Sequence, residues 1–447
     1  MITIPTFDDA ARRMAHDAVD AIFDHVQQIA AKPVVAWRDV DDLASRVTIG
    51  ARPVDESIRL LLEHAIQLHH PSYMGHQVCP PFPTAVIADL AISALNQSTA
   101  VWEMSPLGTV IEKEVVRWLA ARAGYPESSL GTAVSGGSAA NLTGLLAARA
   151  KWNDDAANRG KRPLLFCSAD AHYSVARAAG IMGIPADDVV KIATDEEHRL
   201  DVASLEAALD AIDDSSSVLA IVATAGSTAT GAFDRLDTLA DVAQRHGVWL
   251  HVDAAHGASV LLSERLAPLV RGLERADSFA WDPHKMLWMP LSLGIILVRD
   301  GTWLRRAFSA DAPYLFNAAG PALNIGEVTI QCSKRADAVK LWLTLSAIGT
   351  EPFAAALEQV TDVTRYAYEQ VAASDDFEPM HVPHFNIFCW RHRSDDATNA
   401  AIRERLNRSG QAWITTTLLK GQRVLRVTVI NPATQREHID AMLAACR

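Results

Sequence analysis

The sequence predicts an α/β fold built around a large, mostly parallel sheet, followed by a smaller α+β region. In the middle of the chain, short apolar runs alternate with helical stretches. An apolar run without polar interruption indicates a strand buried on both faces, which is typical of parallel sheets. Beyond about residue 326, helices are followed by two or three strands of antiparallel character. A chain of 447 residues is also long enough for two or three packed domains.

The secondary structure can be assigned in chain order from apolar spacing and from proline and glycine positions. The first helices are expected over residues 8–30, 58–68 and 111–123. The buried strands are expected at 163–168, 218–225, 248–252 and 294–298, and the helices around them at 139–152, 204–212 and 236–246. A proline- and glycine-rich stretch at 312–326 predicts a movable loop or a boundary, with helices at 335–348 and then to about residue 373.

These elements divide the chain into three expected segments. Residues 1–69 form an N-terminal helical segment suited to dimerisation, residues 70–325 a large domain that carries the parallel sheet, and residues 326–447 a small C-terminal domain. The second boundary is placed at the proline- and glycine-rich stretch because such composition favours irregular backbone.

The composition excludes several classes of protein. A net charge of −12 argues against nucleic acid or an anionic membrane as the main partner. The five cysteines are scattered without a C-x-x-C pair, which suits a reducing cytosol rather than a disulfide or zinc framework. Residues 1–20 lack the apolar core of a signal peptide, and the longest apolar runs are too short to span a bilayer. We therefore expect a cytoplasmic protein.

Chemistry is expected first at residues 278–286, SFAWDPHKM, where Lys285 follows a short strand. Ligands bind at the carboxyl ends of the strands in open α/β sheets. A lysine in that position can form an imine when burial or a cationic neighbour favours its neutral form. Taken alone, however, the motif fits a solvated loop lysine better.

A second motif is WLHVDAAH at residues 249–256, an apolar strand that ends in an aspartate. Alternation along the strand puts His251, Asp253 and Ala255 on one face. A buried carboxylate needs a cationic partner, and a protonated pyridine nitrogen is one, while the small Ala255 leaves room for a flat ring. The alternative is a metal site of His251, Asp253 and His256, but no further ligand cluster has matching spacing, so no metal is expected.

Two further motifs lie upstream. SGGSAAN at residues 135–141 starts a helix, and its glycines and Ser138 suit a phosphate held at the helix N-terminus, although such turns are also ordinary helix caps. In DAHYS, at residues 170–174, His172 lies between a strand and a helix. This histidine is placed to stack on a cofactor ring, and an ordinary loop histidine is the alternative.

Together, in this order and spacing, the four motifs resemble those of the group II pyridoxal-phosphate decarboxylases, of the fold-type I (aspartate aminotransferase-like) class. That family includes glutamate, cysteine-sulfinate, 2,4-diaminobutyrate and aromatic amino-acid decarboxylases. The resemblance covers roughly residues 70–434. It implies pyridoxal 5′-phosphate as the cofactor, a seven-stranded type of sheet in the large domain, and a homodimer with the active site at its interface.

The resemblance also implies the residues around the cofactor ring. Lys285 is implied to be the Schiff-base lysine and Asp253 to pair with the pyridine nitrogen. His172 is implied to stack on the ring, and Ala255 to line its other face. Lys285, His172 and Asp253 are therefore the expected catalytic residues.

The remaining cofactor contacts follow from the same resemblance. Gly137, Ser138 and His284 are implied to serve the phosphate. Thr224, in VATAGSTATGAFD, matches a threonine near the phenolic oxygen of the cofactor and the substrate carboxylate.

Details within the family favour its glutamate and cysteine-sulfinate branch, notably GGSAAN, TATGAFD and LRVTVINPAT. In that branch an arginine matching Arg426 binds the substrate carboxylate, and an arginine on an exposed strand face is the alternative. HPSYMGHQ brings Tyr73 and His76 to the place where relatives with acidic substrates recognise the side chain. His76 replaces an amide residue there, so an acidic or small polar substrate is expected rather than an aromatic one.

Two departures from the family pattern stand out. Asp282 occupies a position where most relatives have asparagine, and an acid near a phosphate is unfavourable unless it faces a backbone amide or an arginine. Relatives also carry a loop tyrosine that returns a proton to the substrate α-carbon. The matching stretch, 318–328, has none; Tyr314 is the nearest tyrosine and Leu323 the aligned position. Relatives without this tyrosine can divert into transamination or aldehyde formation.

The sequence therefore predicts a carboxy-lyase that removes the α-carboxylate of an amino acid and gives an amine and CO₂. The alternatives at the same cofactor are an aldehyde synthase, which couples decarboxylation to oxidative deamination, and a C–C lyase. A non-catalytic protein of the same fold is a more distant alternative, and the intact set of Lys285, Asp253 and His172 argues against it.

Overall fold

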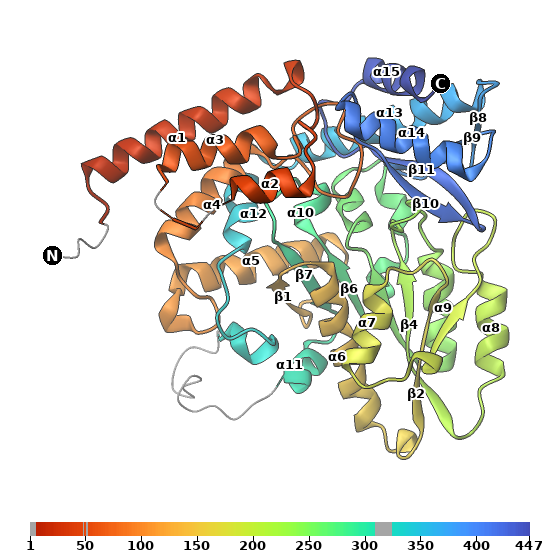
Figure 1. Ribbon diagram of the computed structural model, residues 1–447. Helices are drawn as coiled ribbons and strands as arrows, with labels where there is room; N and C mark the ends of the chain where they lie inside the picture. Colours follow the sequence, from red (N-terminus) through yellow and green to blue (C-terminus); the bar gives the residue numbers. More distant parts are fainter. Residues whose placement is uncertain (1–5, 48, 51, 309–323) are drawn as a thin grey trace. The chain divides into compact units, whose positions relative to one another are not determined.

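The computed structural model describes residues 6–47, 49–50, 52–308 and 324–447 (Figure 1). Internal contacts divide the chain into two compact units. The central unit comprises Gln77–Asp362 and His381–Ile387, and the terminal unit comprises Met1–His76, Val363–Met380 and Phe388–Arg447. The expected division at residues 69/70 and 325/326 cuts the chain by composition rather than by contacts, and it stays a proposal.

A seven-stranded sheet in the central unit has the order β1-β7-β6-β5-β4-β2-β3. Its strands are β1 (Leu130–Val134), β2 (Arg162–Ser168), β3 (Val189–Ile192), β4 (Ser216–Thr224), β5 (Trp249–Asp253), β6 (Ser278–Trp281) and β7 (Gly294–Val298). Neighbouring strands from β6 through β5, β4 and β2 to β3 are parallel, whereas β7 is antiparallel to both β1 and β6. The predicted α/β fold with a large, mostly parallel sheet is confirmed.

Strand β7 shows what an apolar run does and does not predict. All of its residues are buried, as the uninterrupted run indicated, yet it runs against both neighbours. Burial depends on the layers that cover a sheet, whereas direction depends on the connection between strands. Between β6 and β7 the chain forms only the one-turn helix α10 (Pro283–Met286), and no helix long enough for a parallel crossover.

Helices pack against the strands of this sheet. Helix α6 (Gly137–Asp154) contacts β5, β6 and β7, and α9 (Leu236–His246) contacts β4 and β5. Helix α9 ends at Gly247, whose φ of +64° is the left-handed C-cap conformation that glycine adopts without strain. The other helices of this unit include α4 (Pro83–Leu95), α5 (Pro106–Arg122), α7 (Ser174–Ile181), α8 (Val202–Asp210), α11 (Gly301–Phe308) and α12 (Ala338–Ile348).

The terminal unit has its own four-stranded sheet, in the order β10-β11-β9-β8. Its strands are β8 (Phe377–Pro379), β9 (Ile387–His392), β10 (Thr415–Leu419) and β11 (Gln422–Thr428). Two or three strands were expected, and the three-residue β8 is short enough to escape a pattern search. Strands β10 and β11 form a hairpin whose two turn residues, Lys420 and Gly421, have φ of +49° and +80°, as a type I′ turn requires.

Helices of the terminal unit come from both ends of the chain (Figure 1). They are α1 (Asp9–Gln27), α2 (Val40–Arg46), α3 (Val54–His64), α14 (Asp396–Ser409) and α15 (Arg436–Cys446), and the long helix α13 (Glu351–Ala372) crosses the border between the units. Helix α14 packs against β11, and α1 against α3. Within the described part of the chain, no helix is long and apolar enough to span a bilayer.

Candidate active site

Lys285 lies in α10, directly after the carboxyl end of β6. Its Nζ is 3.1 Å from Oδ2 of Asp282, and 21 % of its side chain is exposed. The neighbouring His284 is buried, with Nδ1 2.8 Å from the carbonyl oxygen of Leu293. A partly accessible lysine at the carboxyl end of a strand suits covalent capture of an aldehyde.

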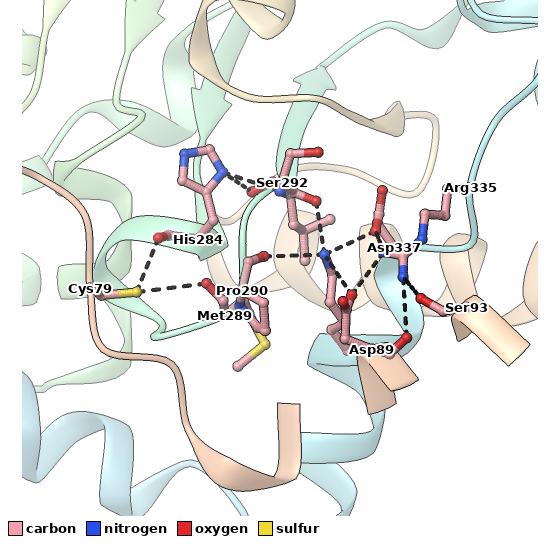
Figure 2. Close-up of polar contacts among 11 residues, drawn as sticks. Cys79, Asp89, Ser93, His284, Met289, Pro290, Ser292, Arg335 and Asp337 are labelled. Atoms are coloured by element: carbon pink, nitrogen blue, oxygen red, sulfur yellow. Dashed lines mark hydrogen bonds and ion pairs between the residues drawn. The ribbon is translucent and has the colours of Figure 1, made fainter. Parts of the chain in front are cut away.

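The backbone around Lys285 is held on one side by a cysteine (Figure 2). Sγ of the buried Cys79 lies 3.1 Å from the carbonyl oxygen of His284 and 3.6 Å from that of Met289. Burial raises the pKa of this thiol to about 12, so it stays protonated and donates to these oxygens.

A buried lysine, Lys340, also fixes this loop. Nζ of Lys340, whose side chain is fully buried, donates to the carbonyl oxygens of Pro290 at 3.1 Å and Ser292 at 2.9 Å. Its charge is balanced by Asp337 at 2.9 Å and Asp89 at 3.5 Å. The hydrogen bonds from Lys340 could not be predicted from the sequence, because Lys340 lies in α12, far along the chain from the loop that it fixes.

Asp253 is buried at the end of β5, and its carboxylate is fixed by the side-chain amide of Asn141, for which the sequence predicted no role. Nδ2 of Asn141 donates to Oδ2 of Asp253 at 2.9 Å, and Oδ1 of Asn141 lies 3.0 Å from Nε2 of His251. Burial lowers the pKa of His251 to about 4, so at neutral pH the ring is neutral and its Nε2–H donates to the amide oxygen. His251 and Asp253 therefore share one face of the strand, as predicted.

His172 belongs to the same network. Its Nδ1 lies 2.8 Å from Oγ of Ser174, which accepts from Nδ2 of Asn141 at 3.0 Å. Burial lowers the pKa of His172, while the charge of Asp253 opposes that shift and the charge of Lys285 adds to it. The structure thus brings His172, Asp253 and Lys285 together around one site, with Asn141 between the first two.

The glycine-rich start of α6 forms a close cradle beside Lys285. A Cβ on Gly137 would come within 2.9 Å of both the Ala255 methyl group and Oδ2 of Asp282. The N–H of Gly137 donates to that same carboxylate oxygen at 2.9 Å. Gly136 has a φ of +149°, which an L side chain rarely adopts. Ser138, which is exposed, follows in the first turn of α6.

Thr224 supplies a direct test of whether a ligand fits here. It ends β4 and lies beside Asp253 in the register of β4 and β5. Its Oγ1 is buried and has no hydrogen-bond partner among the described residues. Buried hydroxyl groups are rarely left unsatisfied, so this atom indicates a polar ligand group next to Asp253. An aldehyde-bearing pyridine ring with a phosphate tail fits the lysine, the carboxylate, this hydroxyl and the cradle.

The three predicted substrate residues gather in the terminal unit. Nη1 of the buried Arg426 donates to the carbonyl oxygen of Gly75 at 3.2 Å and to Oγ1 of Thr415 at 3.1 Å. The Tyr73 hydroxyl accepts the N–H of His76 at 3.3 Å. Arg426 is thus not an exposed strand arginine, and that alternative is wrong.

A cavity of about 500 Å³ in the terminal unit is lined by His76, Ala400, Ala401, Arg403, Glu404, Thr415, Thr416 and Arg423. Its charge is predominantly positive. Glu404 is shared between Arg403 at 3.1 Å and Arg408, which does not line the cavity. Among the described residues, Arg423 has no acidic partner; its Nη1 donates to Oγ1 of Thr416 at 3.2 Å.

The residues of the metal alternative do not converge. Asn141 separates His251 from Asp253, and Nε2 of His256 lies 2.7 Å from Oδ1 of Asn386 instead. No group of three or more histidine, cysteine, aspartate or glutamate side chains able to hold a metal occurs in residues 6–47, 49–50, 52–308 and 324–447. The loop expected to lack the tyrosine begins at residue 318, and its part up to 323, like Tyr314, lies outside the described residues.

Comparisons with known proteins show which family the chain resembles. The chain matches the pyridoxal-dependent decarboxylase conserved domain over residues 49–393. It is 35 % identical to L-2,4-diaminobutyrate decarboxylase of Rhizobium meliloti, with 91 % of this chain and 84 % of that one covered. It is 34 % identical to cysteine sulfinic acid decarboxylase of Rattus norvegicus, with 81 % and 76 % covered. The crystal structure of mouse CSAD superposes with a TM-score of 0.92 at 28 % identity, with 99 % and 98 % covered.

Proposed function

Because the chain belongs to the pyridoxal-dependent decarboxylase family, it is a pyridoxal 5′-phosphate enzyme that decarboxylates an amino acid, and we propose that this amino acid has an acidic side chain. We further propose that Lys285 holds the cofactor and that Asp253 pairs with its pyridine nitrogen. The position of Lys285 after β6, the strand that pairs with β5 and its buried, anchored Asp253, supports these roles.

The bound cofactor supplies a sink for the electrons released when the Cα–carboxylate bond breaks. Asp253, a carboxylate held by Asn141, keeps a proton on the ring nitrogen and so strengthens that sink. With the cofactor bound, the neutral His172 would stack on one face of its ring, and Ala255 would leave space on the other. The Thr224 hydroxyl would donate to the phenolic oxygen, which would give this buried group the partner that it lacks among the described residues.

The charge of the cavity beside His76 supports the proposal of an acidic substrate. The relatives themselves do not decide it, because diaminobutyrate and cysteine sulfinic acid have side chains of opposite charge at 35 % and 34 % identity. Arg403 and Arg423 face this cavity with only Glu404 to balance them, and Arg408 shares that carboxylate. A carboxylate or sulfinate side chain compensates this charge, whereas an ammonium side chain adds to it.

The role of His76 follows from its protonation. Burial lowers the pKa of His76 first, and the charges of Arg426 and Arg403 lower it further. At neutral pH the ring is therefore neutral, so it offers a hydrogen bond rather than a charge. The arginines supply the attraction for the acid.

The test is a panel of amino acids assayed for CO₂ release, with cysteine sulfinate, aspartate and glutamate set against 2,4-diaminobutyrate, tryptophan and DOPA. Arg423→Gln should raise KM for the acidic substrate about tenfold, the loss of about 1.4 kcal/mol of binding, with little change in kcat. Arg405→Gln is the matched control, because this arginine of α14 lies outside the cavity and donates to the carbonyl oxygen of Ala445 rather than to Glu404. Turnover of tryptophan or DOPA with no activity on the acidic amino acids would overturn the preference.

We also propose a homodimer in the cytoplasm. Helices α1 and α3 carry exposed apolar side chains, namely Met14, Val19, Ile22, Phe23, Val54 and Leu61. Neither helix has a buried residue within the described part of the chain, so a second copy is the partner that would cover them. Light scattering of the holoenzyme should give twice the 48.4 kDa mass of the chain, and a monomer would refute the proposal. The scattered positions of the five cysteines, without a C-x-x-C pair, support the cytoplasmic location.

A further inference from the structure

Asp282 is a buried carboxylate at the place proposed for the phosphate of the cofactor. It has 1 % of its surface exposed. Its Oδ2 accepts from the N–H of Gly137 at 2.9 Å and lies 3.1 Å from Nζ of Lys285 and 3.5 Å from Nε2 of His284. Its Oδ1 is buried and has no hydrogen-bond partner among the described residues. One oxygen therefore has three polar neighbours, and the other is buried without a hydrogen-bond partner among the described residues.

This carboxylate acts as the N-terminal cap of α6. Gly136, the N-cap residue, has no side chain to supply a capping hydrogen bond to this 18-residue helix. Asp282 supplies it from the end of β6 through Gly137. Because a helix N-terminus attracts negative charge, the carboxylate uses the attraction that would otherwise hold a phosphate.

The groups that face Asp282 do not offset a second anion. From α10 come Lys285 and His284, and burial lowers the pKa of His284, so that it is neutral at neutral pH. His172, before α7, is near enough to feel the charge of Asp282 and is likewise kept neutral by burial. From β7 comes only Gly294, where an added Cβ would lie 2.7 Å from Oδ1. Among the described residues, Lys285 is the single charged cation in contact with this carboxylate.

We propose that Asp282 is an internal anion that competes with the phosphate of the cofactor for the N-terminus of α6, so that this enzyme holds the phosphate weakly and exchanges its cofactor readily. The inference rests on the proposed site, with the cofactor on Lys285 and its phosphate at Gly137 and Ser138. Asparagine at this position keeps an oxygen for the Gly137 N–H and adds an N–H₂ donor for the phosphate, without the charge.

The test compares two ligands that differ only in the phosphate. Cofactor-free wild type and Asp282→Asn are titrated with pyridoxal 5′-phosphate and with pyridoxal, with tryptophan fluorescence quenching as the readout. The variant should bind pyridoxal 5′-phosphate about tenfold more tightly, while its affinity for pyridoxal changes less than about twofold. The variant should also bind inorganic phosphate more tightly than wild type does.

Two further variants provide a second removal of the charge and a control. Asp282→Ser removes the charge but keeps an oxygen for the Gly137 N–H, so it should show the same gain if Asp282→Asn does not fold. Asp201→Asn is the matched control, because Asp201 caps α8 through the N–H of Ser204, away from the site. It should leave the ratio of the two affinities unchanged.

The outcomes separate the two proposals. Borohydride reduction and peptide mapping of wild type and variants report whether the cofactor is linked to Lys285, and the absence of that linkage would refute the proposed site. With the linkage present, an unchanged ratio of pyridoxal 5′-phosphate to pyridoxal affinity in both charge-removing variants would overturn the role of Asp282 alone. Weaker binding of the phosphorylated ligand by the variants would overturn it too.

Discussion

The edge of the central sheet and the cavity of the terminal unit are built in different ways. Around Asp253, buried polar groups are joined in a continuous hydrogen-bonded network that runs through Asn141 to His251 and, by way of Ser174, to His172. In the cavity, Arg423 bonds to a hydroxyl and Arg403 shares its only acidic partner among the described residues. The first region fixes the positions and protonation states of its side chains. The second carries positive charge that the described acidic side chains balance only in part.

This difference predicts how substitutions divide between rate and affinity. Changes in the network should act on kcat, because the network sets the ring electronics that are felt most in the transition state. Changes in the cavity should act on KM, because side-chain charge is recognised equally in the ground state and the transition state. The Arg423→Gln variant tests the second half, and the variants that follow test the first.

Lys285→Ala should have the largest effect in the network. Without the ε-amino group, the cofactor has no covalent attachment, and turnover should be eliminated. The readouts are loss of the Schiff-base absorbance and loss of a borohydride-reducible linkage. If reduction still attached the cofactor to another lysine, the assignment of Lys285 would be wrong. The central network could then no longer be taken as the cofactor site.

Asp253→Asn should come next, with kcat lowered about 100-fold or more and the cofactor still bound. The amide keeps the shape of the carboxylate but removes the charge that holds a proton on the ring nitrogen. Asn141→Ala tests the same role in another way, because it leaves the charge of Asp253 and removes the hydrogen bonds that join this carboxylate to Ser174 and His251. It should lower kcat by about tenfold, in line with a hydrogen bond to a charged group. An unchanged kcat in Asp253→Asn would remove the electron-sink role from this residue.

The sequence predicted the central site better than the terminal one, and the reason is physical. Residues at the carboxyl ends of parallel strands meet at one edge, so the strand patterns put Asp253 and Lys285 at the same edge, and the resemblance assigned them to one site. The links between them were not predictable in this way. Asn141 lies in α6 and Lys340 in α12, and neither position has a local pattern that indicates its distant partner.

In the terminal unit, prediction rested on resemblance for Arg426 and His76. The cavity itself escaped prediction, because it combines His76 with α14 and with the β10–β11 hairpin. No local pattern in α14 distinguishes Arg403, which lines the cavity, from Arg408, which does not, and only the tertiary structure shows this difference. Asp282 was recognised as a departure, and the structure supplied the backbone amide that it faces.

The smallest expected effect concerns the proton that the substrate α-carbon must receive. The position of the relatives' tyrosine is Leu323, outside the described residues, so the donor has to be sought among His172, Lys285, Tyr314 and trapped water. Burial lowers the pKa of His172, so at neutral pH little of the protonated imidazole is present to donate a proton. When protonation of the α-carbon is slow, molecular oxygen can react at this carbon first, or the proton can add to the C4′ atom of the cofactor instead. The natural enzyme should therefore form some aldehyde with peroxide, and slowly some pyridoxamine phosphate, beside the amine.

Leu323→Tyr should raise the amine fraction and lower the aldehyde about twofold, with kcat for CO₂ release nearly unchanged, because bond cleavage precedes protonation. Leu323→Phe is the control, since it adds the ring without the hydroxyl. The measurement is the ratio of amine to aldehyde and peroxide over many turnovers. Stoichiometric amine from the natural enzyme would show that another donor already fills the role. His172→Gln would then identify it: aldehyde appearing in that variant would mean that the network around Asp253 governs the outcome of the reaction as well as its rate.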